Sequence, residues 1–361
     1  MTADQIQAAL GAFFEHHLDC TLAEAKVIKS VEADGDEFVA TLRFGFPLQT
    51  YQAELRAHIQ SWLAGQLGEV KVRLDISSKI SSHAVQNNLT PVPGVKNIIA
   101  VASGKGGVGK STTAVNLALA LHAEGATVGI LDADIYGPSQ PRMLGASGRP
   151  ELLVEEKRML PKMAHGIQSM SIGYLVDEEE AMIWRGPMVT SALNQLLTET
   201  KWTDVDYLII DLPPGTGDIQ LTMSQKIPVS GAVIVTTPQD IALLDARKGL
   251  EMFKKVNVPV LGVIENMSVH ICSNCGHPEH IFGEGGGEQL AADTGVDLLG
   301  ALPLDMGIRS EADSGTPTVV ADPEGAITAI YAQIARTTVA RLSIKDRNYS
   351  NAFPKITVTN T

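Results

Sequence analysis

A glycine-rich stretch at residues 103–112 ends in Lys110, Ser111 and Thr112 with the spacing G-x-x-x-x-G-K-[ST]. An apolar run precedes it and a helical pattern follows it, which is the strand–turn–helix context of a phosphate-binding loop. Glycines let backbone N–H groups point at phosphate oxygens, and the helix N-terminus adds the positive end of its dipole. We expect Lys110 to contact the β- and γ-phosphates of a nucleotide and the Ser111 hydroxyl to coordinate Mg²⁺. The other residues expected around the phosphates are Gly104, Gly106, Gly107, Val108, Gly109 and Thr112.

Three aspartates end apolar, strand-like runs: Asp132 and Asp134 after one run and Asp211 after another. In-line phosphoryl transfer to water requires a group that orients the water and an acid near Mg²⁺. We expect Asp211 to hold Mg²⁺ or a water bound to it. The stretch D-L-P-P-G-T-G-D at 211–218 predicts a rigid turn whose free N–H groups can sense a γ-phosphate. Ordinary turn chemistry around Asp132 and helix capping by Asp211 are the alternatives.

Cys272 and Cys275 form a C-x-x-C pair, and two thiolates at this spacing can bind one metal ion or two irons of a cluster. His277 and His280 could complete a zinc site, although the interval between Cys275 and His277 is tighter than usual. A redox dithiol is the third alternative, but the pair does not open a helix in a thioredoxin-like unit. We expect the remaining cysteine, Cys20, to be a small buried apolar residue.

The motif K-G-G-x-G-K-[ST] at 105–111 resembles the deviant-Walker family of dimeric ATPases. The stretch at 211–218 and the C-x-x-C pair after Asn266 are similar to the Mrp-type (ApbC) iron–sulfur cluster carriers within that family. The resemblance implies that Lys105 reaches the partner's nucleotide across a dimer interface. It also implies that Asp134 positions the attacking water, that Asp132 lies on the metal side, and that Asn266 contacts adenine. An asparagine amide suits the N6 and N7 edge of adenine, while a turn-forming asparagine is the alternative.

The implied function is to hold a [4Fe–4S] cluster on Cys272 and Cys275 at a homodimer interface and to transfer it to apo-proteins. The implied partners are a second copy of the chain, a cluster-assembly scaffold and apo iron–sulfur proteins, with ATP and Mg²⁺ as cofactors. ATP would be hydrolysed slowly, with Lys105, Lys110 and Asp134 as the catalytic residues. Two alternatives stay open: a partitioning or positioning ATPase of the same superfamily, and a zinc-binding scaffold with a vestigial nucleotide site.

From residue 95 onward, apolar β-branched runs alternate with helical patterns. These are the strands and helices that must position the candidate residues. Buried strands of this kind predict a doubly wound α/β fold with a mostly parallel sheet covered on both faces. Such sheets bind ligands at the carboxyl ends of their strands, where the loop, the acids and Asn266 all fall. The predicted strands are 97–102, 127–131, 207–210, 232–236, 260–264 and 298–301.

Residues 1–90 predict a separate small α+β domain in the order α-β-β-α-β. We divide the chain into this domain, a linker at 91–95 rich in proline and glycine, a P-loop ATPase domain at 96–345 and a tail at 346–361. In the small domain, helical patterns lie at 6–14 and 51–67, and strand-like runs at 25–28, 38–44 and 70–76.

The composition limits the classes of function. The chain has 361 residues, 44% of them apolar, which is enough for two domains with sizeable cores. A net charge of −13 argues against a general nucleic-acid or anionic-membrane binder. There is no apolar run of about 18 residues and no secretory signal pattern. We therefore expect a cytoplasmic protein without nucleic-acid or membrane partners.

Overall fold

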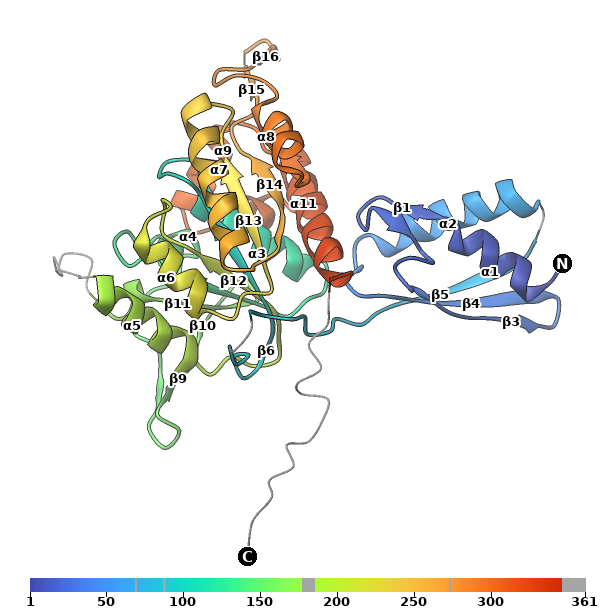
Figure 1. Cartoon of the computed structure of the whole chain (residues 1–361), viewed down its shortest axis with the longest axis horizontal. Coiled ribbons are helices and arrows are strands. Elements are labelled where there is room, and N and C mark those ends of the chain that lie inside the picture. Colours follow the sequence, from blue (N-terminus) through green and yellow to red (C-terminus); the bar gives the residue numbers. More distant parts are fainter. Residues whose placement is uncertain (69, 87–88, 177–185, 273, 346–361) are drawn as a thin grey trace, which may run out of the picture.

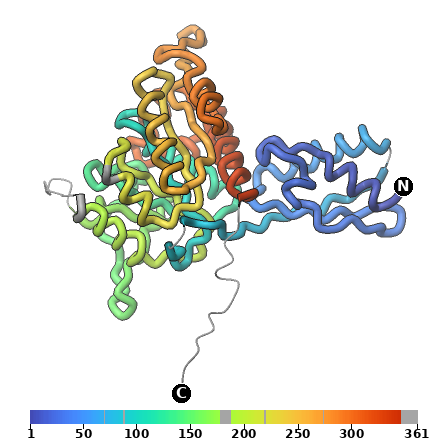
Figure 2. Tube along the Cα trace, in the orientation of Figure 1, coloured from blue at the N-terminus to red at the C-terminus, as the bar shows by residue number. Residues whose placement is uncertain are grey.

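The computed structural model shows a small N-terminal module beside a larger body built on one open sheet (Figure 1, Figure 2). It describes residues 1–68, 70–86, 89–176, 186–272 and 274–345. The predicted tail at 346–361 therefore lies outside the described residues. Within the described ranges, no helix is long and apolar enough to cross a membrane.

The N-terminal module is a three-stranded sheet with two helices packed against it (Figure 1). β3 and β4 form an antiparallel hairpin around Gly35, and β5 adds to β4 in parallel. Every second residue of β4 is buried, namely Ala40, Leu42 and Phe44, as expected for a sheet with one face in the core. The bounds are α1 (Ala3–Gly11), β3 (Ile28–Asp34), β4 (Glu37–Phe44), α2 (Gln52–Leu67) and β5 (Val72–Ser78).

The predicted strand at 25–28 is wrong. The Ala25 N–H donates to the Thr21 carbonyl, and Lys26 adopts a left-handed φ of 55°. A residue in that region cannot continue an extended strand, so β3 begins only at Ile28. A short pair that was not predicted, β1 (Phe14–Glu15) with β2 (Cys20–Thr21), also takes Phe14 out of the predicted first helix.

Eight strands form the central sheet in the order β10-β11-β7-β12-β6-β13-β14-β17. Neighbouring strands are parallel except β10 and β11, which run antiparallel at one edge. The predicted doubly wound, mostly parallel α/β fold is therefore confirmed, although β10 and β11 were not predicted. The strands are β6 (Val95–Ala102), β7 (Val128–Asp132), β10 (Lys162–Ala164), β11 (Ile167–Ser171), β12 (Val205–Asp211), β13 (Gly231–Thr236), β14 (Val260–Glu265) and β17 (Leu298–Ala301).

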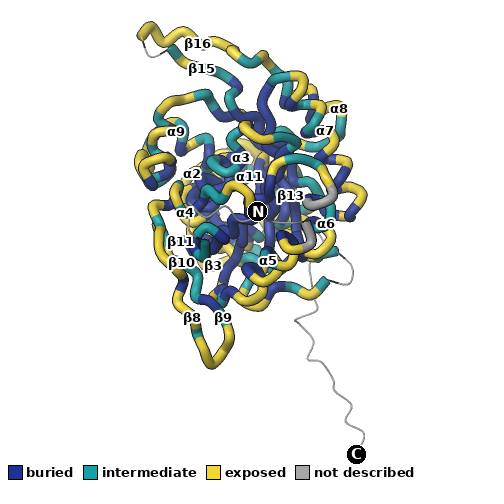
Figure 3. Tube along the Cα trace, turned by 90° about the vertical axis from the view of Figure 1, so that its left-hand side faces the viewer, coloured by how far each residue is buried: buried dark blue, intermediate teal, exposed yellow. Residues whose placement is uncertain are grey.

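Both faces of this sheet are apolar. On β6, Ile99 and Val101 join the core under α3 and α11, whereas Ile98 and Ala100 join the core under α5, α6 and α7. Burial on both faces explains why the strands read as continuous apolar runs, and Figure 3 shows the buried strands at the centre of the body. The helices are α3 (Lys110–Ala123), α4 (Gln140–Met143), α5 (Gly186–Thr198), α6 (Asp218–Lys226), α7 (Asp240–Lys255), α8 (Gly286–Thr294), α9 (Met306–Asp313), α10 (Thr318–Ala321) and α11 (Ala326–Ser343), with a 3₁₀ turn at Ile172–Tyr174.

Two short hairpins leave the body of the sheet. One pairs β8 (Leu152–Leu153) with β9 (Arg158–Met159). The other pairs β15 (His270–Ile271) with β16 (Pro278–Glu279) and follows the carboxyl end of β14. Figure 1 shows this second hairpin at the top of the molecule, beyond the ends of the helices.

The N-terminal module docks onto α11 and onto the end of α3. The Glu124 carboxylate is buried, accepts a hydrogen bond from the Thr50 N–H at 3.2 Å and pairs with Arg336 at 2.8 Å. One apolar core runs through both modules. The His83 N–H also donates to Asn97 at 3.0 Å, and Gln86 donates to the Ser224 carbonyl at 2.9 Å. The chain leading into the predicted linker is thus fastened to the larger body, and the domain boundaries themselves remain a prediction.

Replacing Glu124 with alanine is expected to lower the free energy of unfolding by about 3 kcal/mol, because breaking a buried ion pair leaves Arg336 without its carboxylate. Urea unfolding followed by circular dichroism measures this change. The control is Asp313→Ala, which removes the exposed Arg309–Asp313 pair at 3.0 Å and should cost less than about 1 kcal/mol. Equal losses of unfolding free energy in the two variants would show that the buried Glu124–Arg336 pair contributes no more than an exposed pair.

Candidate functional site

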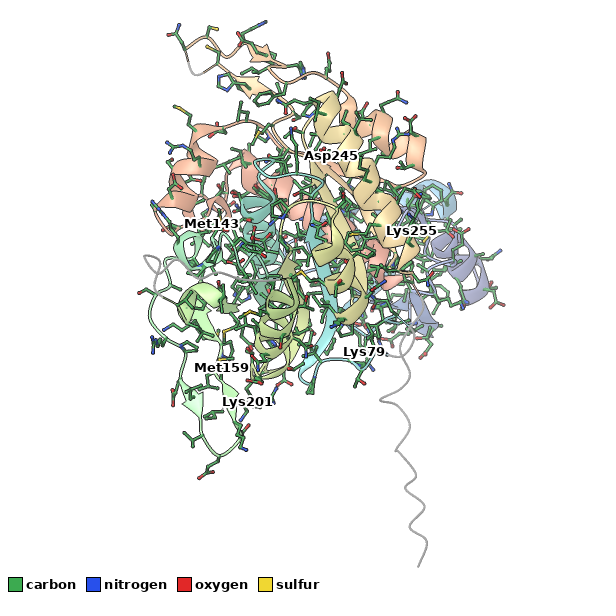
Figure 4. All side chains as sticks on the ribbon, turned by 60° about the vertical axis from the view of Figure 1, so that its left-hand side comes forward. Lys79, Met143, Met159, Lys201, Asp245 and Lys255 are labelled. Atoms are coloured by element: carbon green, nitrogen blue, oxygen red, sulfur yellow. The ribbon has the colours of Figure 1, made fainter. Side chains whose placement is uncertain are left out.

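The glycine-rich loop connects β6 to α3 and is pressed against its neighbours. Gly107 and Gly109 have φ of 83° and 79°, in the left-handed region that suits glycine. A Cβ atom at Gly104 would lie 2.2 Å from the backbone of Asp245, which Figure 4 labels on α7. α3 begins at Lys110 without a side-chain cap, so its first N–H groups are left for an anion. This cradle fits the phosphates of a nucleotide.

Lys110, Ser111 and Asp211 meet directly behind the loop. The Lys110 side chain is 6% exposed, its ammonium pairs with the fully buried Asp211 carboxylate, and it donates to Ser111 Oγ at 3.1 Å. An ammonium, a hydroxyl and a carboxylate together are the donor set that Mg²⁺–nucleotide binding requires. The structure therefore brings together residues from two separate sequence motifs.

Asp132 lies beside Asp211 on the adjacent strand, at the same level of the sheet. Its carboxylate accepts hydrogen bonds from the N–H groups of Asp134, Ser139 and Gln140 and from the Ser171 hydroxyl, at 2.9–3.2 Å. Burial, reinforced by the Asp211 charge, raises the pKa of Asp132 to about 7. Four donors already form hydrogen bonds with this carboxylate. These bonds hold the loop after β7 in place.

Asp134 is half-buried on the same loop, where its Oδ1 accepts a hydrogen bond from the Gly137 N–H at 3.3 Å. Burial raises the pKa of Asp134, while the nearby Lys110 ammonium acts in the opposite direction. Lys105 is also half-buried, and its ammonium has no ion pair or hydrogen bond with the part of the chain that the structure describes. Both side chains therefore remain available to groups outside this chain.

Gln140, at the start of α4, belongs to the site although no sequence motif indicated it. Its Nε2 donates to Asp211 Oδ2 at 2.9 Å and to the Ser111 carbonyl at 3.1 Å. Gln140 therefore connects Ser111 and Asp211, the two residues expected to hold Mg²⁺. The side chain is fully buried, and Oε1 has no hydrogen-bond partner among the described residues. Gln140 thus fixes the orientation of Asp211 from the side opposite to Lys110.

Replacing Gln140 with leucine is expected to raise the Mg²⁺ concentration needed for half-maximal nucleotide binding about 10-fold or more, because residues that orient metal ligands typically contribute that much to metal affinity. Fluorescent ADP titrated at a series of Mg²⁺ concentrations measures this shift. Ser139→Ala is the matched control, since the Ser139 side chain makes no hydrogen bond within the described residues. An unchanged Mg²⁺ dependence in a folded Gln140 variant would contradict the assignment.

Asn266 follows β14 and packs against the loop. Its Nδ2 donates to the Val108 carbonyl at 2.9 Å, and a Cβ atom at Gly109 would lie 2.1 Å from the same nitrogen. Its backbone N–H donates to the Thr236 carbonyl. The side-chain Oδ1 makes no hydrogen bond with the described residues. Asn266 therefore holds the phosphate loop through one end of its amide and leaves the other end unoccupied.

The two cysteines lie apart from this cluster, at the end of the β15–β16 hairpin. The Cys272 N–H donates to the His277 carbonyl, and the Gly276 N–H donates to the Cys272 carbonyl, which closes the turn. Backbone N–H groups of Asn274 and Cys275 donate to the Cys272 sulfur and lower the pKa of its thiol. Cys275 is exposed. A thiolate stabilised in an exposed turn is suited to bind a soft metal.

The histidines near this pair do not complete a zinc site within one chain. His280 Nδ1 bonds to the Ser268 carbonyl at 2.9 Å, and its Nε2 faces Glu284 at 3.7 Å. Among the described residues, the ligand atoms of the two cysteines do not gather with a histidine nitrogen into a set of three. This arrangement of the two cysteines therefore favours further metal ligands supplied from outside the chain.

A doubly wound sheet with a lysine-containing phosphate loop and a buried acid on the adjacent strand defines a P-loop nucleoside triphosphatase. A family model described as the ParA-type NUBPL iron-transfer P-loop NTPase matches residues 94–339. The chain therefore belongs to the NUBPL/Mrp iron–sulfur carrier family of P-loop NTPases.

Individual relatives extend the match to most of the chain. An iron–sulfur cluster carrier protein of Pseudomonas fragi is 61% identical over 271 residues, covering 75% of this chain and 94% of the relative. The Escherichia coli K12 protein of the same description is 53% identical over 332 residues, covering 92% of this chain and 90% of the relative. A nucleotide-binding protein of Archaeoglobus fulgidus, solved with ADP, is 36% identical with a TM-score of 0.55, covering 64% of this chain and 90% of that one.

Proposed function

We propose that this protein is an ATP-dependent carrier that receives a [4Fe–4S] cluster from a scaffold protein, holds it between two copies of the chain and passes it to apo-proteins. The observation that carries the proposal is the C-x-x-C pair on a projecting hairpin of a P-loop NTPase. The relatives named as iron–sulfur cluster carriers support it. The cluster is cargo in this proposal.

The number of thiolates supports a shared cluster. A [4Fe–4S] cluster takes four thiolates, and one hairpin offers Cys272 and Cys275. The chain's third cysteine, Cys20, lies in the β1–β2 pair of the N-terminal module. A two-fold axis would bring both hairpins together and supply four thiolates, because an isologous interface places the same residues on both sides.

Exposed apolar side chains around the hairpin support the same interface. Ile271 and Ile281 are exposed on the hairpin and just after it, and Ile241 and Leu244 are exposed on α7. The loop after the hairpin approaches the start of α7, since a Cβ atom at Gly283 would lie 3.5 Å from the Pro238 carbonyl oxygen, just before α7 begins. Exposed large apolar residues in one region mark an interaction surface. We assign this surface to a second copy, whose nucleotide Lys105 would reach.

The nucleotide site would hydrolyse ATP slowly to ADP and phosphate. Lys110 binds the phosphates, Ser111 and Asp211 hold Mg²⁺, and Asp134 orients the attacking water. Mg²⁺ supplies neutralisation of phosphate charge when bound. We assign Asp132 to anchoring the Asp134 loop, in place of the metal-side role that the family resemblance implied. Asn266 Oδ1 is proposed to accept a hydrogen bond from the adenine amino group.

Anaerobic purification followed by iron, zinc and acid-labile sulfide analysis tests the proposal, together with an ultraviolet–visible spectrum. The expected result is iron and sulfide in equal amounts with cluster absorbance. Mixing the loaded protein with an apo-enzyme that requires a [4Fe–4S] cluster should restore the activity of that enzyme. Stoichiometric zinc without iron would replace the carrier proposal with a zinc scaffold.

A further inference from the structure

A cluster of metal-binding side chains lies at the junction of the two modules, away from the nucleotide site and the cysteines. Glu15 ends β1, and His16 and His17 follow it in a tight turn. A carboxylate oxygen and one nitrogen from each histidine lie within 4.8 Å of one another. The three side chains therefore converge on one small volume.

Two of these ligands are fixed in place. The Glu15 side chain is fully buried, and its oxygens accept hydrogen bonds from the Tyr51 hydroxyl at 2.9 Å and the Leu18 N–H at 2.8 Å. His17 is buried and bonds through Nδ1 to Thr337 Oγ1 of α11 at 2.8 Å. When Nδ1 donates this hydrogen bond, Nε2 keeps its lone pair, which is the usual arrangement of a metal-ligating histidine.

The third ligand, His16, lies on the exposed side of the cluster. His16 is 57% exposed, and its Nδ1 lies 3.8 Å from Glu15 Oε1. Bonds of about 2.1 Å to a tetrahedral ion need ligand separations of roughly 3.4 Å. The exposed ring of His16 is free to make that adjustment, and its outer position leaves one side of the ion open to water.

The two guanidinium groups near the cluster are each paired with carboxylates. Arg336 pairs with Glu124 at 2.8 Å, and Arg341 pairs with Asp19 at 3.0 Å and with Asp297 at 3.2 Å. These three carboxylates and Glu15 outnumber the two guanidinium groups by two negative charges.

We propose that Glu15, His16 and His17 form a binding site for one divalent transition-metal ion of the zinc type, placed where the N-terminal module meets α11. Two imidazoles and a carboxylate are ligands that such ions accept. Because His17 is bonded to Thr337, a bound ion would fasten the turn after β1 to α11. This site does not depend on the proposed carrier function.

The test uses the full-length chain with Cys272→Ser and Cys275→Ser, so that the hairpin thiolates do not compete for metal. Cobalt(II) is the spectroscopic probe and zinc(II) the competitor. We expect one cobalt per chain, visible d–d absorption without a thiolate charge-transfer band, and displacement by zinc. A thiolate band would place Cys20 in the coordination sphere and overturn the proposed ligand set.

A single substitution then tests His16 as one of the ligands. His16→Ala changes an exposed side chain, so the protein should fold, and cobalt affinity should fall at least about tenfold. His58→Ala, which removes an exposed histidine from α2, is the matched control and should leave the affinity unchanged. Zinc should raise the thermal midpoint of the His58 variant more than that of the His16 variant. Equal cobalt affinity in the two variants would overturn the site.

Discussion

Replacing Cys275 with alanine is expected to abolish stable [4Fe–4S] loading, because a dimer of this variant offers two thiolates where the cluster needs four. Cys272→Ala should have the same effect. Cys20→Ala should leave loading intact, since Cys20 lies in the N-terminal module. Iron and sulfide per chain after anaerobic reconstitution, measured together with cluster absorbance, compare the three variants.

The bridging arrangement also fixes the stoichiometry. Loaded wild-type protein should contain about four irons per two chains and run as a dimer on a sizing column. A fully loaded monomer would contradict a shared cluster, as would stable loading of the Cys275 variant. Normal loading of a variant with charged residues at both Ile241 and Leu244, two exposed apolar positions of α7, would show that the dimer uses another surface.

Asp134→Asn is expected to bind ATP normally and to lose about 10²–10⁴-fold in turnover, because it removes the group that orients water. Lys110→Ala should instead weaken ATP binding about 10- to 100-fold, through loss of a charge-assisted phosphate contact. Equilibrium binding of labelled ATP and single-turnover hydrolysis separate the two effects. Thermal unfolding of the Lys110 variant is the necessary control, since Asp211 then loses its buried partner. Wild-type turnover in Asp134→Asn would show that its assigned role is wrong.

The pH dependence of turnover provides a separate check on Asp134. Its ionised form is the one that accepts a hydrogen bond from water, and burial raises the pKa of this carboxyl. Wild-type turnover should therefore decline with falling pH, starting at a higher pH than for an ordinary aspartate. The residual turnover of Asp134→Asn should lack this step, because an amide does not titrate there.

Much of the fold was predictable because the central strands are buried on both faces and read as apolar runs. The strand β11, next to the edge strand β10, was missed because three of the five residues in its sequence, Ile-Gln-Ser-Met-Ser, are polar. Those polar groups find partners elsewhere in the chain: Gln168 bonds to the Thr203 carbonyl, Ser169 to Tyr174 and Ser171 to Asp132. Burial of such a strand depends on tertiary contacts that sequence periodicity does not reveal.

The residues of the candidate site likewise fall into those that the sequence indicated and those that it did not. The phosphate loop is contiguous in sequence, so its spacing alone indicated the residues that the structure arranges in a cradle. Gln140 contacts Asp211, 71 residues away, and Asn266 contacts Val108, 158 residues away. No local pattern encodes either contact. Asp132 could not be recognised as a loop anchor because its donors, Ser139 and Ser171 among them, meet it only in the folded chain.

A short segment, residues 267–269, joins Asn266 to the β15–β16 hairpin. Asn266 holds the phosphate loop through Val108. The residues after Asn266 are bonded to the segment that follows β17, with the Ser268 N–H donating to the Leu302 carbonyl and His270 Nδ1 bonded to the Leu304 carbonyl. We expect that a segment held in this way would pass a movement of the phosphate loop on to the hairpin. For the proposed cluster site, thermodynamic linkage would then impose reciprocity: by whatever factor a nucleotide changes the affinity for the cluster, the cluster would change the affinity for that nucleotide equally.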